Sequence, residues 1–402
     1  MSNETTTQPT QATVAPGAVP FTKIMPVLFG FFIMGFVDVV GIAATKIQNQ
    51  FGLSNTMVNT LASAVFLWFL VCSVPTSLLM NKIGRKNTVL VSLGVTVVAM
   101  LVAFIAQTFA MFVAAFVLVG IGNAIIQVSL NPLLTNVVRG EFLTSSLNYG
   151  QFIKAISSLI GAPLATIATN YLGGWKMAFL VFAVLTVLSA VWLMLTPVKR
   201  EIPEGKPSTF ADCFGLLGDK AILLFFLGIL CVVGIDVGMN FTSPKLLQFR
   251  CGASENVAIY GQTIYFAGRT IGAFIGASLL LKVSARLFFI VSMSVTIAAM
   301  AVMLFTSNLL AVQVLIFIIG FAVANVFGII FGAALQKLPA KANEISGLMI
   351  MGVSGGAIFP FLMGAMADAA KGMGVQVGAI FVLLVCAAYL MFCALSVKEK
   401  KA

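Results

Sequence analysis

The chain is 402 residues long, 60% of its residues are hydrophobic and only 9% are charged. Water-soluble domains are about 45–50% apolar and about 25% charged, so this composition excludes a soluble enzyme with a single membrane anchor. The net charge of +11 could indicate nucleic-acid binding, but the basic residues flank hydrophobic runs and form no patch. The sequence therefore predicts a polytopic, all-α membrane protein that contacts lipid and binds no nucleic acid.

The chain contains no histidine, which removes His-based metal sites, the Ser-His-Asp triad and the usual near-neutral proton switch. Its six cysteines lie mostly within apolar runs without CxxC spacing, so buried thiols are expected in place of disulfides or a metal site. A nucleophile motif and a Walker-type loop are also missing from the sequence. We expect no enzyme activity, no metal and no cofactor, and proton chemistry must then use carboxylates or a lysine.

Residues 1–20 are rich in Thr, Gln and Ala and lack the basic start of a signal peptide, so they predict a disordered tail. Apolar runs that are long enough to cross a bilayer follow, because about 20 residues span its hydrocarbon core. The twelve predicted spans are approximately 24–45, 57–80, 88–107, 109–137, 143–170, 175–196, 221–247, 257–281, 286–306, 309–336, 345–367 and 375–396. We predict two pseudo-symmetric six-helix bundles (21–196 and 221–397), a linker (197–220) and a short tail (398–402).

Lysines and arginines at the ends of these spans and between them are sorted by side. If both termini lie on one face, that face and the linker receive most of them, and the opposite face keeps Lys46, Lys176, Lys245, Arg250 and Lys371. The positive-inside rule then places the two termini and the linker in the cytoplasm. Two bundles of six spans, facing each other across a cavity, are typical of the major facilitator fold.

Two aspartates lie deep inside apolar runs at matching places in the two halves. Asp38 is in the GFVDVVG piece of the first span, and Asp236 is in the VGIDVG piece of the seventh. A lone carboxylate there costs on the order of 3 kcal/mol or more, so such residues usually have a function. Lys154 and Arg269 give each half one base as well. We expect pairing, either in static ion pairs or in pairs whose strength changes as the cavity opens.

Polar side chains form stripes on four of the spans, with steps of three or four residues that put each set on one helix face. The stripes are Asn123, Gln127 and Asn131; Asn148, Gln151, Lys154 and Ser158; Asp236, Asn240 and Ser243; and Gln262, Tyr265 and Arg269. Such stripes can hold helices together, but four of them favour a hydrated central cavity. Pro132, directly after Asn131, is expected to loosen the helix backbone there.

Glycines predict two local features of the second half. Gly268, Gly272 and Gly276 repeat every four residues, which favours a close helix–helix contact. The Gly355-Gly356 pair before Pro360 predicts a bend in the eleventh span.

Several segments resemble the fucose permease group, the fucose–galactose–proton symporters of the major facilitator superfamily. These segments are Gly120 to Pro132, Leu147 to Gln151, Tyr265 to Gly272, Ala334 to Gly347, Gly355 with Gly356, and Gly364 to Asp368. The stretch Ser77 to Lys86 is also similar to the cytoplasmic loop motif of the superfamily, with Asn81 where that motif has Asp. The resemblance implies a sugar importer of the inner membrane that works by alternating access.

The resemblance also implies roles for single residues. Asp38 matches the family's first-helix carboxylate, which takes part in proton coupling, and Gln151 matches its sugar-contacting glutamine. Asn131 with Pro132 matches the Asn-Pro of the fourth span. Asp236 falls where relatives often have a polar or acidic residue.

Two residues depart from the family pattern. Gln127 stands where the pattern has a glutamate, and an amide can bind sugar hydroxyls but cannot carry a proton. Lys154 stands where a neutral residue is expected, and its charge could compensate for the change. If Asp38 and Lys154 pair, Asp38 would bind a proton only when the pair separates.

We therefore predict a secondary active importer of a neutral hexose, such as fucose, galactose, glucose or an N-acetylhexosamine, coupled to protons. Asp38, Lys154 and Asp236 are the predicted coupling residues, and Arg269 is a charge partner. The predicted substrate-binding residues are Gln127, Asn131, Gln151, Asn123, Asn148, Asn240, Gln262 and Tyr265. A uniporter, a sodium-coupled carrier and a carrier of a sugar acid remain alternatives, and a non-transporting sugar sensor is a more distant one. We expect a monomer in the inner (cytoplasmic) membrane.

Overall fold

The computed structural model describes residues 21–38, 43, 46–47, 50–52, 55–138, 140–200, 208–258, 260–370 and 376–397. Both predicted tails and part of the predicted linker lie outside these ranges. Regular structure in the described ranges is helical throughout. The predicted all-α fold class is confirmed.

The first half consists of long helices that pack side by side. They are α1 (Phe21–Met34) with the 3-10 turn η1 (Gly35–Asp38), α3 (Asn55–Ile83), α4 (Arg85–Ile105), α5 (Phe109–Leu133) with the turn η2 (Leu134–Asn136), α6 (Gly140–Tyr171) and α7 (Met177–Leu195). Gly84 separates α3 from α4 with a φ of 87°, a conformation that favours glycine. Helix α5 packs between α3 and α4, and α1 lies against α6 and α7.

The second half repeats this arrangement with more interrupted helices. It contains α9 (Lys220–Lys245) with the π-helical turn η4 (Leu246–Arg250), α10 (Glu255–Ala258), α11 (Tyr260–Leu279), α12 (Ala285–Phe305), α13 (Leu309–Val323), α14 (Val326–Lys337), η5 (Pro339–Lys341), α15 (Ala342–Met351), η6 (Gly352–Ser354), α16 (Gly355–Ala369) and α17 (Val377–Ser396). Helix α11 packs on α13, and α17 packs on α9, α12 and α16.

Nine helical stretches in the described residues are long and apolar enough to cross a membrane. The apolar stretch Thr22–Val37 and the helices α6 and α11 occupy the places of the first, fifth and eighth predicted spans. The outer surface carries many exposed leucine, valine and phenylalanine side chains, for example Leu195 and Phe305. A surface of this kind suits a protein whose solvent is lipid.

Among the described residues, the tenth and eleventh predicted spans are broken. The eleventh span is divided by η6, three residues of 3-10 helix directly before Gly355, next to the bend that the glycine pair predicts. The tenth span is divided at Ala324 and Asn325, between α13 and α14. Asn325 is fully buried, and its amide nitrogen donates to the carbonyl of Gly272 on α11 at 2.7 Å. This bond ties the break to the neighbouring helix.

Part of the linker is itself helical. Helix α8 (Phe210–Gly215) begins with a capping box, in which Thr209 and Asp212 each accept from the other's backbone N–H. The turn η3 (Leu216–Gly218) follows, and Asp219 caps α9 by accepting from the amides of Ala221 and Ile222. Helix α8 contacts α3 of the first half and α15 of the second half, so the linker touches both halves.

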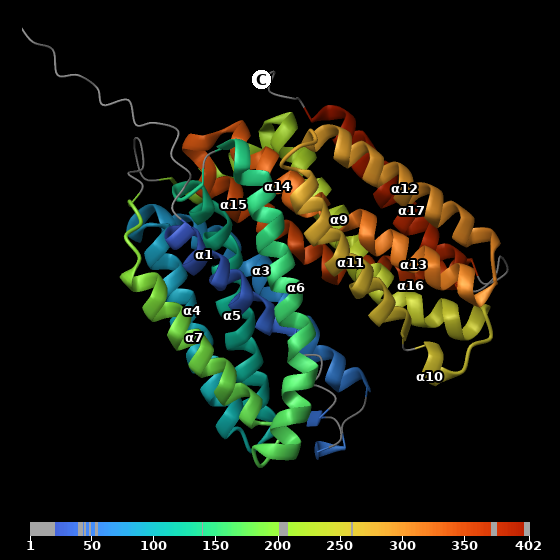
Figure 1. The fold of residues 1–402 in the computed structure, drawn as a ribbon, viewed down its shortest axis with the longest axis horizontal. Helices are drawn as coiled ribbons and strands as arrows, with labels where there is room; N and C mark the ends of the chain where they lie inside the picture. The colour runs from blue at the N-terminus through green and yellow to red at the C-terminus, as the bar shows by residue number, and fades with distance from the viewer. Residues whose placement is uncertain are drawn as a thin grey trace, which may run out of the picture.

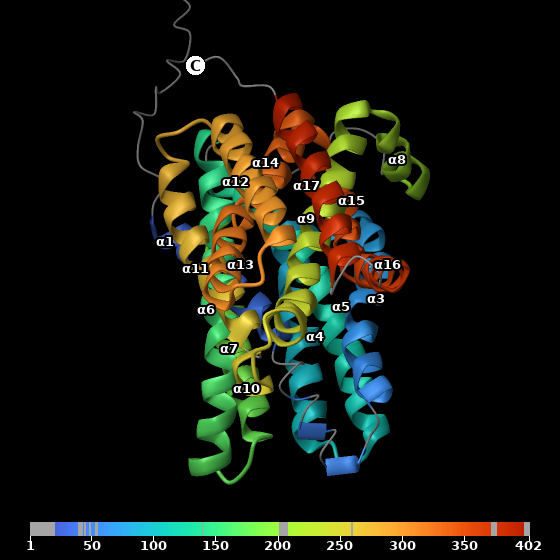
Figure 2. The ribbon, with the colours of Figure 1, turned by 90° about the vertical axis from the view of Figure 1, so that its right-hand side faces the viewer.

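The two halves approach each other at one end of the molecule. Figure 1 shows the first half in blue to green and the second in yellow to red, close together near α14 and α15 and diverging toward α10. Figure 2 shows α8 at the same end as α15. We call this the linker end, defined by α8, the start of α6, the end of α14 and the start of α15. Helices α3, α5 and α6 of the first half contact α11, α14 and α15 of the second half.

Candidate functional site

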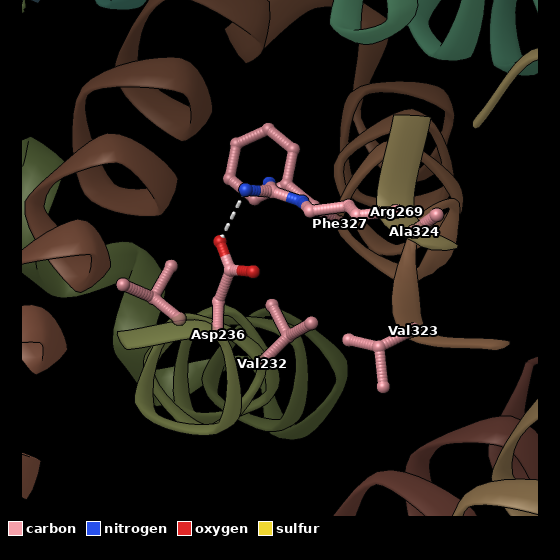
Figure 3. Close-up of a pocket in the computed structure, with 7 residues that line it drawn as sticks. Val232, Asp236, Arg269, Val323, Ala324 and Phe327 are labelled. Atoms are coloured by element: carbon pink, nitrogen blue, oxygen red, sulfur yellow. Dashed lines mark ion pairs between the residues drawn. The ribbon is translucent and has the colours of Figure 1, made fainter. Parts of the chain in front are cut away.

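A charge cluster lies between α9 and α11 of the second half. The Asp236 carboxylate on α9 forms an ion pair with Arg269 on α11, with 2.6 Å between Oδ2 and Nη1. Its other oxygen, Oδ1, accepts a hydrogen bond of 2.8 Å from the hydroxyl of Tyr265, one helical turn before Arg269. Figure 3 shows the Asp236 side chain pointing from α9 toward the guanidinium. Both carboxylate oxygens therefore have strong donors.

Close backbone packing holds α11 in this place. Cβ atoms added to Gly268 and Gly272 would overlap the carbonyl oxygens of Phe317 and Phe321 on α13. Gly320 on α13 lies equally close to the carbonyl of Tyr265. The predicted close contact of the glycine repeat is present, and it fixes the backbone that carries Tyr265 and Arg269.

The ion pair borders a small pocket with apolar walls. The pocket is lined by Val232, Val233, Asp236, Arg269, Val323, Ala324 and Phe327, and its free volume is about 20 Å³. This is close to the space of one water molecule. The side chains of Asp236 and Arg269 are 19% and 28% exposed, while Tyr265 is fully buried. A small molecule could therefore touch the charged pair, but it could not touch Tyr265 in this conformation.

In the first half, the predicted stripe of α5 forms a chain of amides. The Asn123 side chain donates to the carbonyl of Met34, the last residue of α1, at 2.8 Å. Gln127 donates to the side chain of Asn123, and Asn131 donates to the backbone carbonyl of Gln127, each at 2.7 Å. All three amides are buried. The Oδ1 atom of Asn131 is buried and has no hydrogen-bond partner among the described residues, so a donor could reach this acceptor only after the neighbouring helices move.

The turn that carries Asp38 packs directly on α6. A Cβ atom added to Gly35 would lie 2.6 Å from the carbonyl oxygen of Lys154 and 2.7 Å from the Cβ of Ser157. The backbone of η1 therefore touches the turn of α6 that bears Lys154, whose side chain is half-buried. The side chain of Asp38 lies outside the described part of the structure.

The remaining predicted site residues differ in their exposure. Gln151 and Asn240 are half-buried, and Gln262 is exposed. Asn148 is buried where the halves meet: its amide donates to the Thr144 carbonyl of its own helix, and it packs against Gly328 of α14. Asn148 thus belongs to the contact between the halves in this conformation.

Hydrogen bonds join the halves at the linker end. Asn81 donates to the Glu344 carboxylate at 2.8 Å and accepts from Asn343 at 2.6 Å, and Arg85 donates to Asn343 at 2.7 Å. Sequence reasoning missed Asn343 and Glu344. In the sequence they are two polar residues directly before an apolar span. Ordinary helix ends contain such residues too, so the pattern did not single them out.

Two further bonds connect α6 with α11. The hydroxyl of Ser145 donates to the carbonyl of Ala277 at 2.7 Å, and the hydroxyls of Tyr149 and Ser278 are 2.8 Å apart. The two contacts lie one helical turn apart on α6, so they hold one face of this helix against the second half.

Two helical halves with polar groups inside membrane-length helices define a membrane transporter of the duplicated type. Residues 27–360 match the model of the Major Facilitator Superfamily. The chain belongs to this superfamily and is a multi-pass membrane protein; the family is one of transporters, not of enzymes.

Curated relatives match most of the chain. The glucose/galactose transporter of Brucella abortus (strain 2308) is 26% identical over 383 residues, which cover 90% of each chain. The putative glucose/galactose transporter of Helicobacter pylori (strain ATCC 700392 / 26695) is 24% identical over 366 residues, which cover 84% of this chain and 87% of the relative.

Solved structures share the fold. A crystal structure of the E. coli fucose:proton symporter FucP matches with a TM-score of 0.83, covering 95% of this chain and 100% of that one at 15% identity. A FucP structure in the outward conformation matches with a TM-score of 0.80, covering 94% and 99% at 16% identity. The resemblance to the fucose permease group is thereby confirmed in fold.

Proposed function

We propose that the protein is a secondary active transporter that imports a neutral hexose or a related sugar by alternating access, with protons as the coupling ion. The observation that carries this proposal is the presence of one polar cluster in each half, the α5 amide chain and the Asp236–Arg269 pair, in a fold whose halves meet at one end. The names of the curated relatives support a sugar substrate.

The contacts at the linker end supply one of the two states that alternating access needs. With the linker in the cytoplasm, as the positive-inside rule favours, this conformation is closed toward the cytoplasm. Transport to the inside then requires the bonds of Asn81, Ser145 and Tyr149 to break together. We place the protein in the inner membrane as a monomer with both termini in the cytoplasm.

In the first half, we assign sugar binding to amide side chains and proton coupling to a carboxylate with a lysine partner. Gln127, Asn131 and Gln151 bind sugar hydroxyls, since amides both donate and accept. The buried Oδ1 of Asn131, which has no partner among the described residues, would accept such a hydroxyl once the alternating halves uncover it. Asp38 is the protonatable group and Lys154 is its switch partner. The packing of Gly35 on the Lys154 turn supports that pairing. Asp38 would bind a proton when the alternating halves separate it from Lys154.

Proton movement in proteoliposomes tests the proposal. Single sugars (fucose, galactose, glucose or N-acetylglucosamine) are added without an imposed gradient, and the external pH and the sugar uptake are followed. External alkalinisation with one sugar, lost in Asp38→Asn and kept in the control Asp212→Asn, would support proton symport of that sugar. Uptake without a pH change would overturn the proton coupling and leave a uniporter or a sodium-coupled carrier. No uptake of any sugar would overturn the substrate class.

A further inference from the structure

We propose that Asp236 is a specificity-determining residue that excludes anionic sugars, because its carboxylate occupies the place on Arg269 that a substrate carboxylate would need. This inference rests on the proposed sugar transport and names its substrate class: neutral sugars are accepted and sugar acids are refused. Arg269 could otherwise attract a sugar acid, since guanidinium groups bind carboxylates through directed pairs of N–H donors.

The geometry supports a competition between Asp236 and a substrate carboxylate for Arg269. The Oδ2 atom of Asp236 is 2.6 Å from Nη1 of Arg269, which is the distance of a strong charge-assisted hydrogen bond. Tyr265 donates to Oδ1 at 2.8 Å from a fully buried position. Asp236 is therefore held from two sides, by two residues of one rigidly packed helix. A substrate carboxylate would have to break this arrangement before it could bind.

Displacement of Asp236 is unfavourable because of its surroundings. The walls of the pocket are Val232, Val233, Val323, Ala324 and Phe327, none of which can hydrogen-bond a released carboxylate through its side chain. A buried charge that loses its partner costs far more than a paired one. The incoming anion would also stand close to a second negative charge, which adds repulsion.

A neutral sugar meets neither obstacle. A hydroxyl group can donate to a remaining lone pair of the Asp236 carboxylate, which a carboxylate ion cannot do, and the ion pair stays intact. The free volume of about 20 Å³ beside the pair is that of a single water molecule. It therefore admits a hydroxyl-sized group beside the ion pair.

Matched neutral and acidic sugars test this inference. Galactose is compared with galacturonate, and glucose with glucuronate, because each pair differs at C6 only and the acids are ionised at neutral pH. Binding to the purified protein is measured by competition with the radiolabelled hexose for the wild type and for Asp236→Asn, Asp236→Asn/Arg269→Gln and Tyr265→Phe. Tyr265→Phe is the graded variant because it removes one of the two donors that hold Asp236 and keeps the competing carboxylate on Arg269.

We expect the uronates not to compete in the wild type. In Asp236→Asn, the affinity for the uronate relative to its hexose should rise at least about tenfold, and the added Arg269→Gln change should abolish this gain. Tyr265→Phe should gain less uronate affinity than Asp236→Asn, because the competing carboxylate remains. Wild-type protein that binds uronate as well as hexose would overturn the inference and leave sugar transport standing, and so would a folded Asp236→Asn protein without a gain.

The wild-type competition keeps the inference testable if Asp236→Asn does not fold. The two proposals also fail differently. A wild type that binds neither the hexoses nor the acids would overturn the proposed sugar transport itself, and the exclusion of acids would fall with it.

Discussion

The Ser346 hydroxyl on α15 donates a hydrogen bond of 2.6 Å to the backbone carbonyl of Val128 on α5. In a regular helix this carbonyl would accept from the N–H of residue 132. That residue is Pro132, which has no N–H. The proline thus leaves one carbonyl of the first half without a helical partner, and a serine of the second half uses it. The loosened backbone that Pro132 predicts is therefore a docking point between the halves.

Ser346→Ala should weaken the closed linker end. The substitution removes the bond and leaves the Val128 carbonyl unpaired, at a cost of about 1–3 kcal/mol. The population with an open linker end should rise at least about fivefold, since this factor corresponds to about 1 kcal/mol. The measurement is the rate of maleimide labelling of Cys213 in a variant that keeps this residue as its only cysteine.

Cys213 suits this purpose because of its place. It is fully buried on α8, with its sulfur 3.7 Å from the hydroxyl of Ser77, and burial raises the pKa of its thiol. Because α8 contacts both halves, we expect opening of the linker end to uncover it. Ser294→Ala is the control, since the Ser294 hydroxyl is exposed and bonds within its own helix. Equal labelling rates in Ser346→Ala and the wild type would contradict the proposed docking role.

Asn81→Asp should also open the linker end, although it restores the residue type of the superfamily's loop motif. The Asn81 amide donates to Glu344, which is buried. An aspartate there would face this carboxylate, and two like charges about 4 Å apart repel by roughly 4 kcal/mol at an effective dielectric constant of about 20. Faster labelling of Cys213 is expected. The second change Glu344→Gln should reverse it, and a failure of that rescue would refute the charge explanation.

Asn81 illustrates what sequence could and could not provide. The sequence shows that Asn81 departs from the motif. Its hydrogen-bond partner Glu344, however, lies 263 positions away in the chain. Nothing in the local sequence of Ala342–Met351 distinguishes a residue that bonds to the other half from an ordinary residue at the start of a helix. Contacts between distant helices depend on packing, so sequence alone predicts the candidates and leaves their partners open.

The helices themselves were more accessible to prediction. The predicted span 286–306 corresponds to α12 (Ala285–Phe305). A segment in lipid must form all its backbone hydrogen bonds internally along the apolar core, so a long apolar run predicts a continuous helix. The break at Ala324 and Asn325 escaped prediction, since it contains neither proline nor glycine. It coincides with the bond from Asn325 to Gly272, a tertiary contact. Asp236 and Arg269, in contrast, were expected to find partners because unpaired buried charges are costly, and they pair with each other.

Gly328→Ala should push the halves apart between α6 and α14. A Cβ atom at this position would overlap the buried Asn148 side chain, and overpacking of this kind costs about 1–3 kcal/mol. Spin labels on Asn87→Cys and Lys337→Cys, both exposed at the linker end, should report a larger share of long distances.

The control is Gly94→Ala, because a Cβ atom there meets nothing within 4 Å. This substitution should stabilise α4 by up to about 1 kcal/mol and leave the distances between the two spin labels unchanged. Unchanged distances in Gly328→Ala would contradict the close contact.

The start of α8 should become less stable in acid. The Asp212 carboxylate accepts from the backbone N–H of Thr209 at 2.7 Å and from its hydroxyl at 2.8 Å. These bonds lower the pKa of Asp212 below its ordinary value of 3.8. Because the pKa is lower in the folded cap, the stabilisation is fully present above pH 3.8 and is lost as the pH falls through the lowered value. Hydrogen exchange of the α8 amides, corrected for intrinsic rates, should show protection that falls in this range. Asp212→Asn should remove the pH dependence, because an amide does not titrate, and an identical acid transition in that variant would assign it to another group.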